Sequence, residues 1–297
     1  MSHPSVQVAC STPMQLGESP LWHAAESALY WIDIPGRAVH RLDTRNDQHR
    51  SWPLPAEPGC IARDADGGLI VALRTGLSHL DTDTGGLTPM LDAPYDQDKI
   101  RFNDGRCDAM GRLWTGTIYE PRDQLLGSLF CIERGRIRDA RHAVTTSNGV
   151  AFSNDHRLMY HANTPAHRIH VYDFDLATGI TSNQRLFKQF DTDKTAANYG
   201  GRPDGAAVDS ENAYWCAMFE GGRLLRLSAS GDILQEIALP VRCPTMVAFG
   251  GDDLRTLYIT TGRHNRSPQE LEQYPLSGCV LSLRVETPGL LEFPYLR

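Results

Sequence analysis

Hydrophobic residues in this chain fall into many short runs, and several of these runs alternate with polar residues at every second position. Residues 168–174 and 222–227 show this alternation clearly. A period of two places successive side chains on opposite faces of a β-strand, whereas a helix needs a period near 3.6. No amphipathic segment is long enough to predict a helix. The pattern therefore predicts an all-β protein made of short strands.

A polar or glycine-containing turn followed by an apolar-aromatic strand recurs six times along the chain. The six copies cover residues 24–31, 64–71, 108–114, 153–160, 209–215 and 251–258. A second polar turn follows in each unit, at residues 43–47, 81–86, 133–135, 175–179, 228–231 and 286–289. Six units in 297 residues give about 49 residues per unit, which is close to the span of one four-stranded propeller blade.

We therefore predict one domain over residues 1–297, a six-bladed β-propeller with four-stranded antiparallel blades. Closing six blades into a ring buries both faces of each blade and leaves few free edges. Val6 and Val8 are expected on a strand that completes the last blade. The alternative is a β-sandwich with irregular turns, but the strands of a sandwich do not recur in fours.

Aligning the six units on their first turn reveals a second regularity, a polar position five residues before the turn. This position holds Gly59, Asn103, Asn148 and Asp204, with Glu18 in the same slot of the first unit and Thr245 near it in the sixth. Equivalent positions at the ends of the innermost strands face the central channel of a propeller. We therefore expect Glu18, Asn103, Asn148 and Asp204 to meet on one axis.

Two carboxylates and two amides that converge in a channel would be unfavourable without a partner, because like charges repel and desolvation is costly. A divalent cation resolves this, since Glu, Asp and Asn all present hard oxygen atoms. Each residue alone could instead be a turn former, as in Asn148-Gly149 and Asp204-Gly205. Four such residues in register favour a central metal site.

Composition narrows the classes of partner and compartment. The formal net charge is −7 and no block of Lys and Arg occurs, which argues against nucleic-acid binding. No run of 18 apolar residues predicts a membrane span, and residues 1–20 lack the features of a signal peptide. Seven cysteines without a C-x-x-C spacing favour a reduced, cytoplasmic protein with buried thiols. No obligate protein partner is evident.

Six short motifs, spread in order over nearly the whole chain, carry a family resemblance. They are LGESPLW at 16–22, RFNDG at 101–105, GT at 116–117, GSL at 127–129, SNG at 147–149 and RPDG at 202–205. Together they resemble the SMP-30/gluconolactonase/LRE-like family, which includes regucalcin and bacterial sugar lactonases. The resemblance implies metal-dependent hydrolysis of a small sugar-acid lactone to the free aldonic acid.

The resemblance also implies roles for individual residues. Metal-binding positions of the family match Glu18, Asn148 and Asp204, and the substrate-contacting Arg-x-Asn matches Arg101 and Asn103. Glu120 matches an acidic residue that contacts substrate in some members. Three protein ligands leave positions open for water and a lactone oxygen. Asp204 is the expected general base, and activation of the water by the metal is the alternative.

Several alternatives stay open at this point. The sequence does not choose among Ca²⁺, Mg²⁺, Mn²⁺, Zn²⁺ and Fe²⁺, nor among gluconolactone, xylonolactone, arabinonolactone and galactonolactone. A promiscuous metal-dependent esterase or phosphotriesterase and a non-catalytic metal-binding propeller are the competing functions. We interpret His161, His167 and His170 as an exposed strand edge, and residues 81–85 as a hairpin turn rather than a calcium loop.

Overall fold

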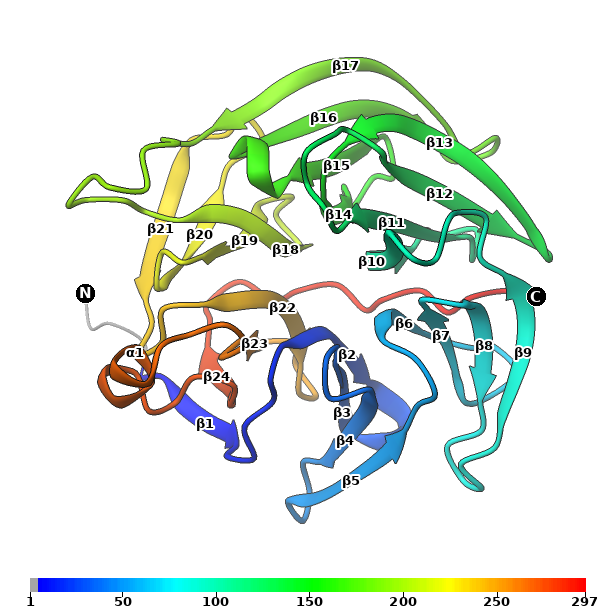
Figure 1. Cartoon of the computed structure of the whole chain (residues 1–297), viewed down its shortest axis with the longest axis horizontal. Helices are drawn as coiled ribbons and strands as arrows, with labels where there is room; N and C mark the ends of the chain where they lie inside the picture. Colours follow the sequence, from blue (N-terminus) through cyan, green and yellow to red (C-terminus); the bar gives the residue numbers. More distant parts are fainter. Residues whose placement is uncertain (1–4) are drawn as a thin grey trace.

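The computed structural model describes residues 5–297, apart from the side chains of residues 141–142. Residues 1–4, the start of the segment expected to lack a signal peptide, lie outside the described residues. The strands form six four-stranded antiparallel sheets that stand around a common centre (Figure 1). This confirms the predicted six-bladed β-propeller.

Each of the first five blades consists of four strands that are consecutive in sequence, and the first of them is innermost. Blade 1 contains β2 (Gly17–His23), β3 (Ala28–Asp33), β4 (Ala38–Asp43) and β5 (Gln48–Pro53). Blade 2 contains β6 (Pro58–Arg63), β7 (Leu69–Leu73), β8 (Gly76–Leu80) and β9 (Leu87–Asp92). Blade 3 contains β10 (Ile100–Cys107), β11 (Leu113–Tyr119), β12 (Gly127–Glu133) and β13 (Arg136–Val144).

The remaining blades follow the same plan, except that the last one draws a strand from the other end of the chain. Blade 4 contains β14 (Ser147–Phe152), β15 (Leu158–Asn163), β16 (Arg168–Asp175) and β17 (Ile180–Gln189). Blade 5 contains β18 (Arg202–Val208), β19 (Tyr214–Phe219), β20 (Arg223–Leu227) and β21 (Ile233–Ala238). Blade 6 contains β22 (Pro244–Gly250), β23 (Thr256–Thr261), β24 (Val280–Arg284) and, outermost, β1 (Gln7–Cys10).

Pairing between β1 and β24 closes the ring, with Val8 opposite Leu281. The first and last strands of the chain are thereby joined in one sheet, and β2 also contacts β22 on the inside. Val8 lies on the closing strand as predicted. Val6 does not, because the strand begins at Gln7; Val6 instead packs, partly buried, against the core shared by blades 5 and 6.

The hydrophobic core consists of six clusters, one at each interface between neighbouring blades. One cluster, for example, joins Tyr30 and Trp52 of blade 1 to Ile61 and Val71 of blade 2. Because each inner strand contributes to the interface on both of its sides, its alternating side chains are buried on both faces. All seven cysteines are buried and free of disulfides, as the sequence predicted.

Helical structure in the described residues is limited to three short segments. They are η1 (Ala24–Glu26), η2 (Thr164–Ala166) and α1 (Pro268–Gln273). Ser267 caps α1 by accepting a hydrogen bond from the Glu270 backbone N–H. Within residues 5–297, none of the helices is long and apolar enough to cross a membrane.

The recurring turn of the sequence has a specific hydrogen-bonding role in blades 3 and 5. Asp108 accepts hydrogen bonds from Trp114 Nε1 at 2.8 Å and Arg112 Nε at 2.7 Å. Asp209 accepts one from Trp215 Nε1 at 2.9 Å. The aspartate that starts the turn therefore satisfies the buried indole N–H six residues later, which explains why these two residues recur together.

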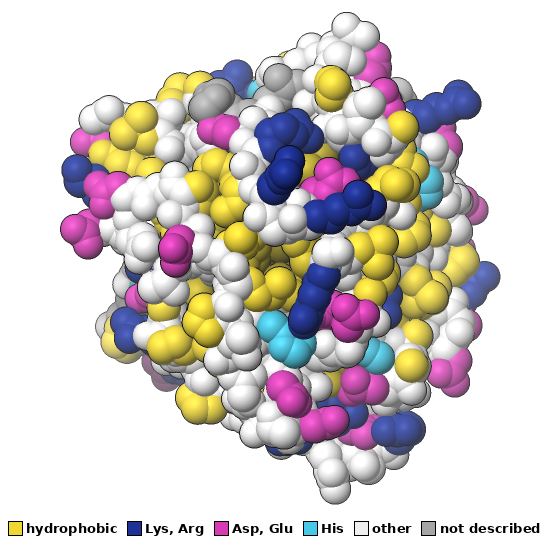
Figure 2. Space-filling model, turned by 90° about the vertical axis from the view of Figure 1, so that its right-hand side faces the viewer, with side chains coloured by type: hydrophobic (Ala, Val, Ile, Leu, Met, Phe, Trp, Pro, Cys, Tyr) yellow, Lys and Arg dark blue, Asp and Glu magenta, His cyan; other side chains and the backbone are white. Residues whose placement is uncertain are grey.

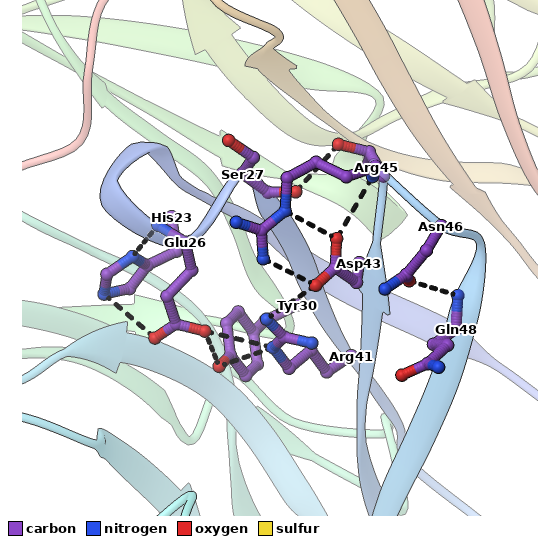
Figure 3. A network of polar contacts seen from close by, with 10 residues as sticks. His23, Glu26, Ser27, Tyr30, Arg41, Asp43, Arg45, Asn46 and Gln48 are labelled. Carbon is purple, nitrogen blue, oxygen red and sulfur yellow. Dashed lines mark hydrogen bonds and ion pairs between the residues drawn. The ribbon is translucent and has the colours of Figure 1, made fainter.

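Blade 1 lacks this aspartate and fixes its turns in another way (Figure 3). Glu26 of η1 accepts hydrogen bonds from Tyr30 Oη at 2.7 Å and Arg41 Nε at 3.0 Å. Arg41 also lies 3.5 Å from Asp43 in the second turn, and Asp43 binds Arg45 Nη2 at 2.7 Å. The two turns of this blade are thus tied together by charged side chains.

The histidines of blade 4 correct the sequence interpretation. His161 and His167 are only 1% and 3% exposed, so they do not form an exposed strand edge. His161 lies on the second strand, where neighbouring blades cover both faces, and its Nε2 is 2.7 Å from Ser147 Oγ. His170 is half-buried. The turn at residues 81–85 is a hairpin turn as predicted, with Asp81 accepting from Asp83 N at 2.9 Å.

The segment after β24 crosses the middle of the ring (Figure 1). It pairs with the turns that follow the innermost strands, Gly289 with Asp209 and Tyr295 with Asp64. Glu292 binds Arg106 of β10 at 2.7 Å. One end of the central channel is therefore covered by the C-terminal segment, and we call it the far end. The end where the innermost strands begin is called the mouth.

Charged side chains of both signs are interspersed on the side of the molecule shown in Figure 2. This face also has a hollow with hydrophobic side chains at its bottom and Lys or Arg around it (Figure 2).

Candidate active site

The six slot positions found in the sequence all lie near the beginning of an innermost strand, at the mouth. They are Glu18 on β2, Gly59 on β6, Asn103 on β10, Asn148 on β14, Asp204 on β18 and Thr245 on β22. In every one of these strands the pairing register shifts at this position. A bulge of this kind bends the strand and re-aims the side chain. The same local irregularity therefore directs each slot residue away from the blade and towards the axis.

One cavity at the mouth is lined by Glu18, Asn103, Asn148 and Asp204 together. The convergence expected from the repeat alignment is thus present in the structure. Ile34, Ile118 and Phe219 form apolar parts of the same wall.

A chain of hydrogen bonds connects the polar residues across blades 3, 4 and 5. Arg101 Nη1 donates to Asn103 Oδ1 at 3.0 Å, and Asn103 Nδ2 donates to Asn148 Oδ1 at 2.6 Å. Asn148 Nδ2 donates to Asp204 Oδ1 at 2.6 Å and to Thr164 Oγ1 at 2.7 Å. Arg101 and Asp204 are therefore held in position relative to each other by Asn103 and Asn148, whose amide groups are themselves hydrogen-bonded.

The glycine after Asn148 is required by its surroundings. Gly149 has a φ of +59°, and a Cβ built on it would lie 2.3 Å from Tyr214 Oη. Tyr214 Oη in turn donates to the Gly149 carbonyl at 2.8 Å. Only glycine allows this close approach between blades 4 and 5 in that backbone conformation. The Asn-Gly pair of the sequence thus combines a pocket residue with a packing residue.

The carboxylates of the pocket lie in an environment that opposes negative charge. Burial, reinforced by repulsion from Asp204 and Asp104, raises the pKa of Glu18 well above its usual range. Burial also raises the pKa of Asp204 to about 8, with Asp104 adding to the effect and Arg202 opposing it. Among the described residues, the Glu18 carboxylate accepts one hydrogen bond, from Ser19 N at 3.2 Å. The pair of acids therefore favours a compensating positive charge, either protons or a cation.

Asp104 is a third acid near the axis, and the sequence analysis did not single it out. It follows Asn103 directly and is 3% exposed. Its Oδ2 accepts from Val150 N at 3.3 Å, whereas Oδ1 has no hydrogen-bond partner among the described residues. Burial raises its pKa to about 6.

Glu120 lies at the rim rather than beside Asp204. Both of its oxygens are 3.0 Å from Arg74 Nη2, and Oε1 is 3.4 Å from Arg101 Nε. It lines a neighbouring cavity, whose wall also includes Arg101 and Arg122. In this structure its direct effect is to hold the Arg101 guanidinium at the edge of the pocket.

Four further polar residues of the pocket were not predicted from the sequence: Arg122, Thr146, Thr164 and Arg202. A signal for Arg202 was available, because it stands two residues before the slot residue Asp204 just as Arg101 stands two residues before Asn103. Thr164 belongs to η2 and Arg122 to the connection between β11 and β12, where the repeat offers no equivalent position.

The residues that could hold a metal are few. Among residues 5–297, apart from the side chains of residues 141–142, no three His, Cys, Asp or Glu side chains gather in a metal-binding arrangement. A cation in the pocket would therefore depend on the carboxylates of Glu18 and Asp204 together with an amide oxygen, and Asn148 lies directly beside Asp204. Such an oxygen-only set suits hard divalent ions.

The fold and the pocket define a six-bladed propeller with an acidic and amide-rich site at one end of its channel. Residues 16–263 match the family model of the SMP-30/gluconolactonase/LRE-like region, and the chain belongs to this family.

Individual relatives cover nearly the whole chain. The 6-deoxy-6-sulfogluconolactonase of Pseudomonas putida is 47% identical over 281 residues, which is 94% of either protein. Regucalcin of Sus scrofa is 29% identical over 303 residues, or 99% of either protein. The crystal structure of the calcium-binding protein regucalcin from Agrobacterium tumefaciens superposes with a TM-score of 0.92 at 27% identity, covering 100% of this chain and 97% of that one.

Proposed function

We propose that this protein hydrolyses the lactone of a sugar acid in the pocket at the mouth, with one divalent cation held by Glu18, Asn148 and Asp204. The observation that carries the proposal is the convergence of these three side chains, from three different blades, in one cavity. Family membership and the similarity to a sugar-acid lactonase over 94% of the chain support the reaction class. The name of the regucalcin structure supports a divalent ion.

The donor set fits such an ion. Glu18 and Asp204 are two carboxylates whose charged forms are disfavoured in the pocket, as their raised pKa values indicate. An amide that turns about its terminal bond would present the Asn148 oxygen to the same space. A bound divalent cation would polarise the lactone carbonyl and offset the negative charge that develops on its oxygen.

Arg101 and Asn103 are suited to orient the substrate. Arg101 Nη1 binds Phe102 O and Asn103 Oδ1, and its Nε faces Glu120. No described residue accepts a hydrogen bond from Nη2, so this nitrogen can donate to a hydroxyl or carbonyl oxygen of the sugar. A guanidinium held by several contacts loses little freedom when it binds substrate, which favours productive orientation.

Asp204 is the proposed general base. Burial raises its pKa in the metal-free pocket, a bound cation would lower this pKa again, and the hydrogen bond from Asn148 fixes its orientation. It would take a proton from water as the water oxygen attacks the carbonyl carbon. The same proton can then pass to the ring oxygen when the ester bond breaks, which yields the open-chain aldonic acid.

The proposal is tested by proton release from a panel of aldonolactones in weak buffer, measured against the spontaneous rate. The panel contains glucono-, xylono-, arabinono- and galactonolactone and 6-deoxy-6-sulfogluconolactone, each assayed with Ca²⁺, Mg²⁺, Mn²⁺, Zn²⁺ or Fe²⁺. We expect acceleration of at least one lactone that depends on the added ion. Rates equal to the spontaneous rate for every lactone and ion would contradict the proposal.

A further inference from the structure

Ion pairs at the mouth of the channel contain more cations than carboxylates. On the side of blades 1 to 3, Glu57 binds Arg37 at 3.2 Å and Arg74 at 3.0 Å, and Glu120 binds Arg74 and lies 3.4 Å from Arg101. On the side of blades 5 and 6, Glu220 is surrounded by three cations, which are Lys194 at 3.3 Å, Arg202 at 3.3 Å and Arg266 at 3.2 Å. Arg266 also lies 3.7 Å from Glu270. Positive charge is thus in local excess in these pairs, although the whole chain carries a net charge of −7.

Arg122 adds to this excess. It lies in the connection between β11 and β12, and it lines the same cavity as Asp204 and Arg202. Its backbone N–H donates to Tyr119 O at 3.1 Å, but its side chain forms no hydrogen bond or ion pair with any residue that the structure describes. Its φ of +61° is uncommon for a residue with a side chain, so the loop holds this arginine in a specific backbone conformation.

The side chain of Arg202 has more contacts than that of Arg122, but not all of its N–H groups have a hydrogen-bond partner among the described residues. Its side chain is 15% exposed, and its guanidinium lies over the Phe219 ring at 5.1 Å from the centroid. Nη2 lies 3.3 Å from Glu220 Oε2, and Nε has no hydrogen-bond partner in the described part of the chain. Arg202 occupies the repeat position of Arg101, so two equivalent arginines flank the pocket from blades 3 and 5.

We propose that Arg122 and Arg202 form an anion subsite, which binds a sulfonate or phosphate group at the end of the substrate remote from the lactone carbonyl. This inference rests on the proposed lactonase function and specifies its substrate class. A simple aldonolactone is neutral and provides no partner for two guanidinium groups. A tetrahedral oxyanion does, because its oxygens accept charge-assisted hydrogen bonds from the planar donors of arginine.

Compensation of the acidic pocket is a weaker explanation for the two arginines. The cation proposed between Glu18 and Asp204 would already neutralise those two carboxylates, and the arginines would then be in surplus. The similarity to a lactonase whose substrate name includes a sulfonate group is consistent with the subsite.

The test compares kcat/KM for glucono-δ-lactone, 6-phosphoglucono-δ-lactone and 6-deoxy-6-sulfoglucono-δ-lactone. For the parent protein, we expect at least one anionic lactone to exceed the neutral one by about tenfold or more. The variants Arg122→Gln and Arg202→Gln should each lower that ratio by about tenfold. The two anionic substrates distinguish a sulfonate subsite from a phosphate subsite.

Arg134→Gln is the matched control. Arg134 belongs to the same blade, has a φ of +48° in an exposed turn and, like Arg122, has no ion pair with a described residue. It lies in the turn between β12 and β13, at the opposite end of the blade from Arg122. The ratio for this variant should equal that of the parent. An anionic-to-neutral ratio near one in the parent, or a ratio unchanged in Arg122→Gln, would overturn the proposal.

Binding of products separates this proposal from the proposed catalysis. Calorimetry with 6-phosphogluconate, 6-deoxy-6-sulfogluconate and gluconate should show tighter binding of an anionic aldonate, lost in Arg122→Gln. If no lactone is hydrolysed but this preference is present, the proposed function fails and the subsite stands. If lactones are hydrolysed and neither anionic aldonate binds better than gluconate, the subsite fails and the proposed function stands.

Discussion

The two ends of the channel are formed by the same six repeats, but they differ in how uniform their residues are. At the far end, blades 3 and 5 repeat the same bond from a turn aspartate to an indole N–H, and the C-terminal segment covers the turns. At the mouth, the six slot positions share one backbone irregularity but carry five different residue types. A turn residue serves its own blade, so repetition suits it. The slot residues serve one shared pocket, so each position needs its own chemistry.

The largest effect is expected for Asp204→Asn. The substitution keeps the size and one oxygen but removes the charge and the proton-accepting group. We expect kcat to fall by a factor on the order of 10² or more, even when metal analysis shows full loading. Glu18→Gln is the control, because a residue that serves only as a ligand should be rescued by saturating metal. Parent-like turnover by metal-loaded Asp204→Asn would remove Asp204 from the role of base.

Arg101→Ala should have the next largest effect. Arg101 is 8% exposed, and its guanidinium joins the rim to the hydrogen-bond chain that ends at Asp204. We expect kcat/KM for the best lactone to fall at least tenfold, about 1.4 kcal/mol, with the metal content unchanged. Steady-state kinetics and metal analysis on the same preparation measure both quantities. Unchanged kinetics would place Arg101 among the structural residues.

A substitution at the far end should lower the stability of the protein and leave its activity unchanged. Glu292 binds Arg106 at 2.7 Å, with 16% and 11% of the two side chains exposed. Glu292→Gln keeps a hydrogen bond but removes the charge, so we expect the free energy of unfolding to fall by about 1 kcal/mol. Because the pair lies away from the mouth, kcat/KM should not change. A lower kcat/KM at full folding would show that the two ends are coupled.

The smallest expected effect is the pH dependence of metal binding. Since burial raises the pKa of Asp204 to about 8 in the metal-free pocket, this acid is protonated at pH 7 and must lose its proton when a cation binds. Metal affinity should therefore rise with pH up to about 8, and binding at pH 7 should release roughly one proton or more. Calorimetry in two buffers of different ionisation enthalpy measures the number. Affinity that does not depend on pH between 6 and 8 would contradict the pocket electrostatics.

The sequence was sufficient to predict the blades, their turns and the convergence of Glu18, Asn103, Asn148 and Asp204. These features depend on local signals, the period-two strands and the turn residues, which repeat often enough to be aligned. The bulge at the slot was not predicted. It occurs in all six inner strands, and it therefore places the aligned residues at structurally equivalent points.

Other features depend on contacts between blades and could not be predicted in this way. His161 alternates with its neighbours like an exposed edge residue, but it is buried because its strand is the second of the blade. Arg122 stands in an irregular connection, and its proximity to Asp204 results only from ring closure. The ion pairs that place Glu120 at the rim join blades 2 and 3. None of these contacts leaves a periodic signal.

The central claim is that the mouth holds a divalent ion on which lactone hydrolysis depends. The direct measurement is the rate of hydrolysis of the best aldonolactone by protein freed of metal with a chelator, before and after addition of one equivalent of metal, with the bound metal determined on each sample. We predict a rate that falls to the spontaneous value and returns with close to one ion bound per chain. Full activity in the presence of chelator, with no metal bound, would contradict the account.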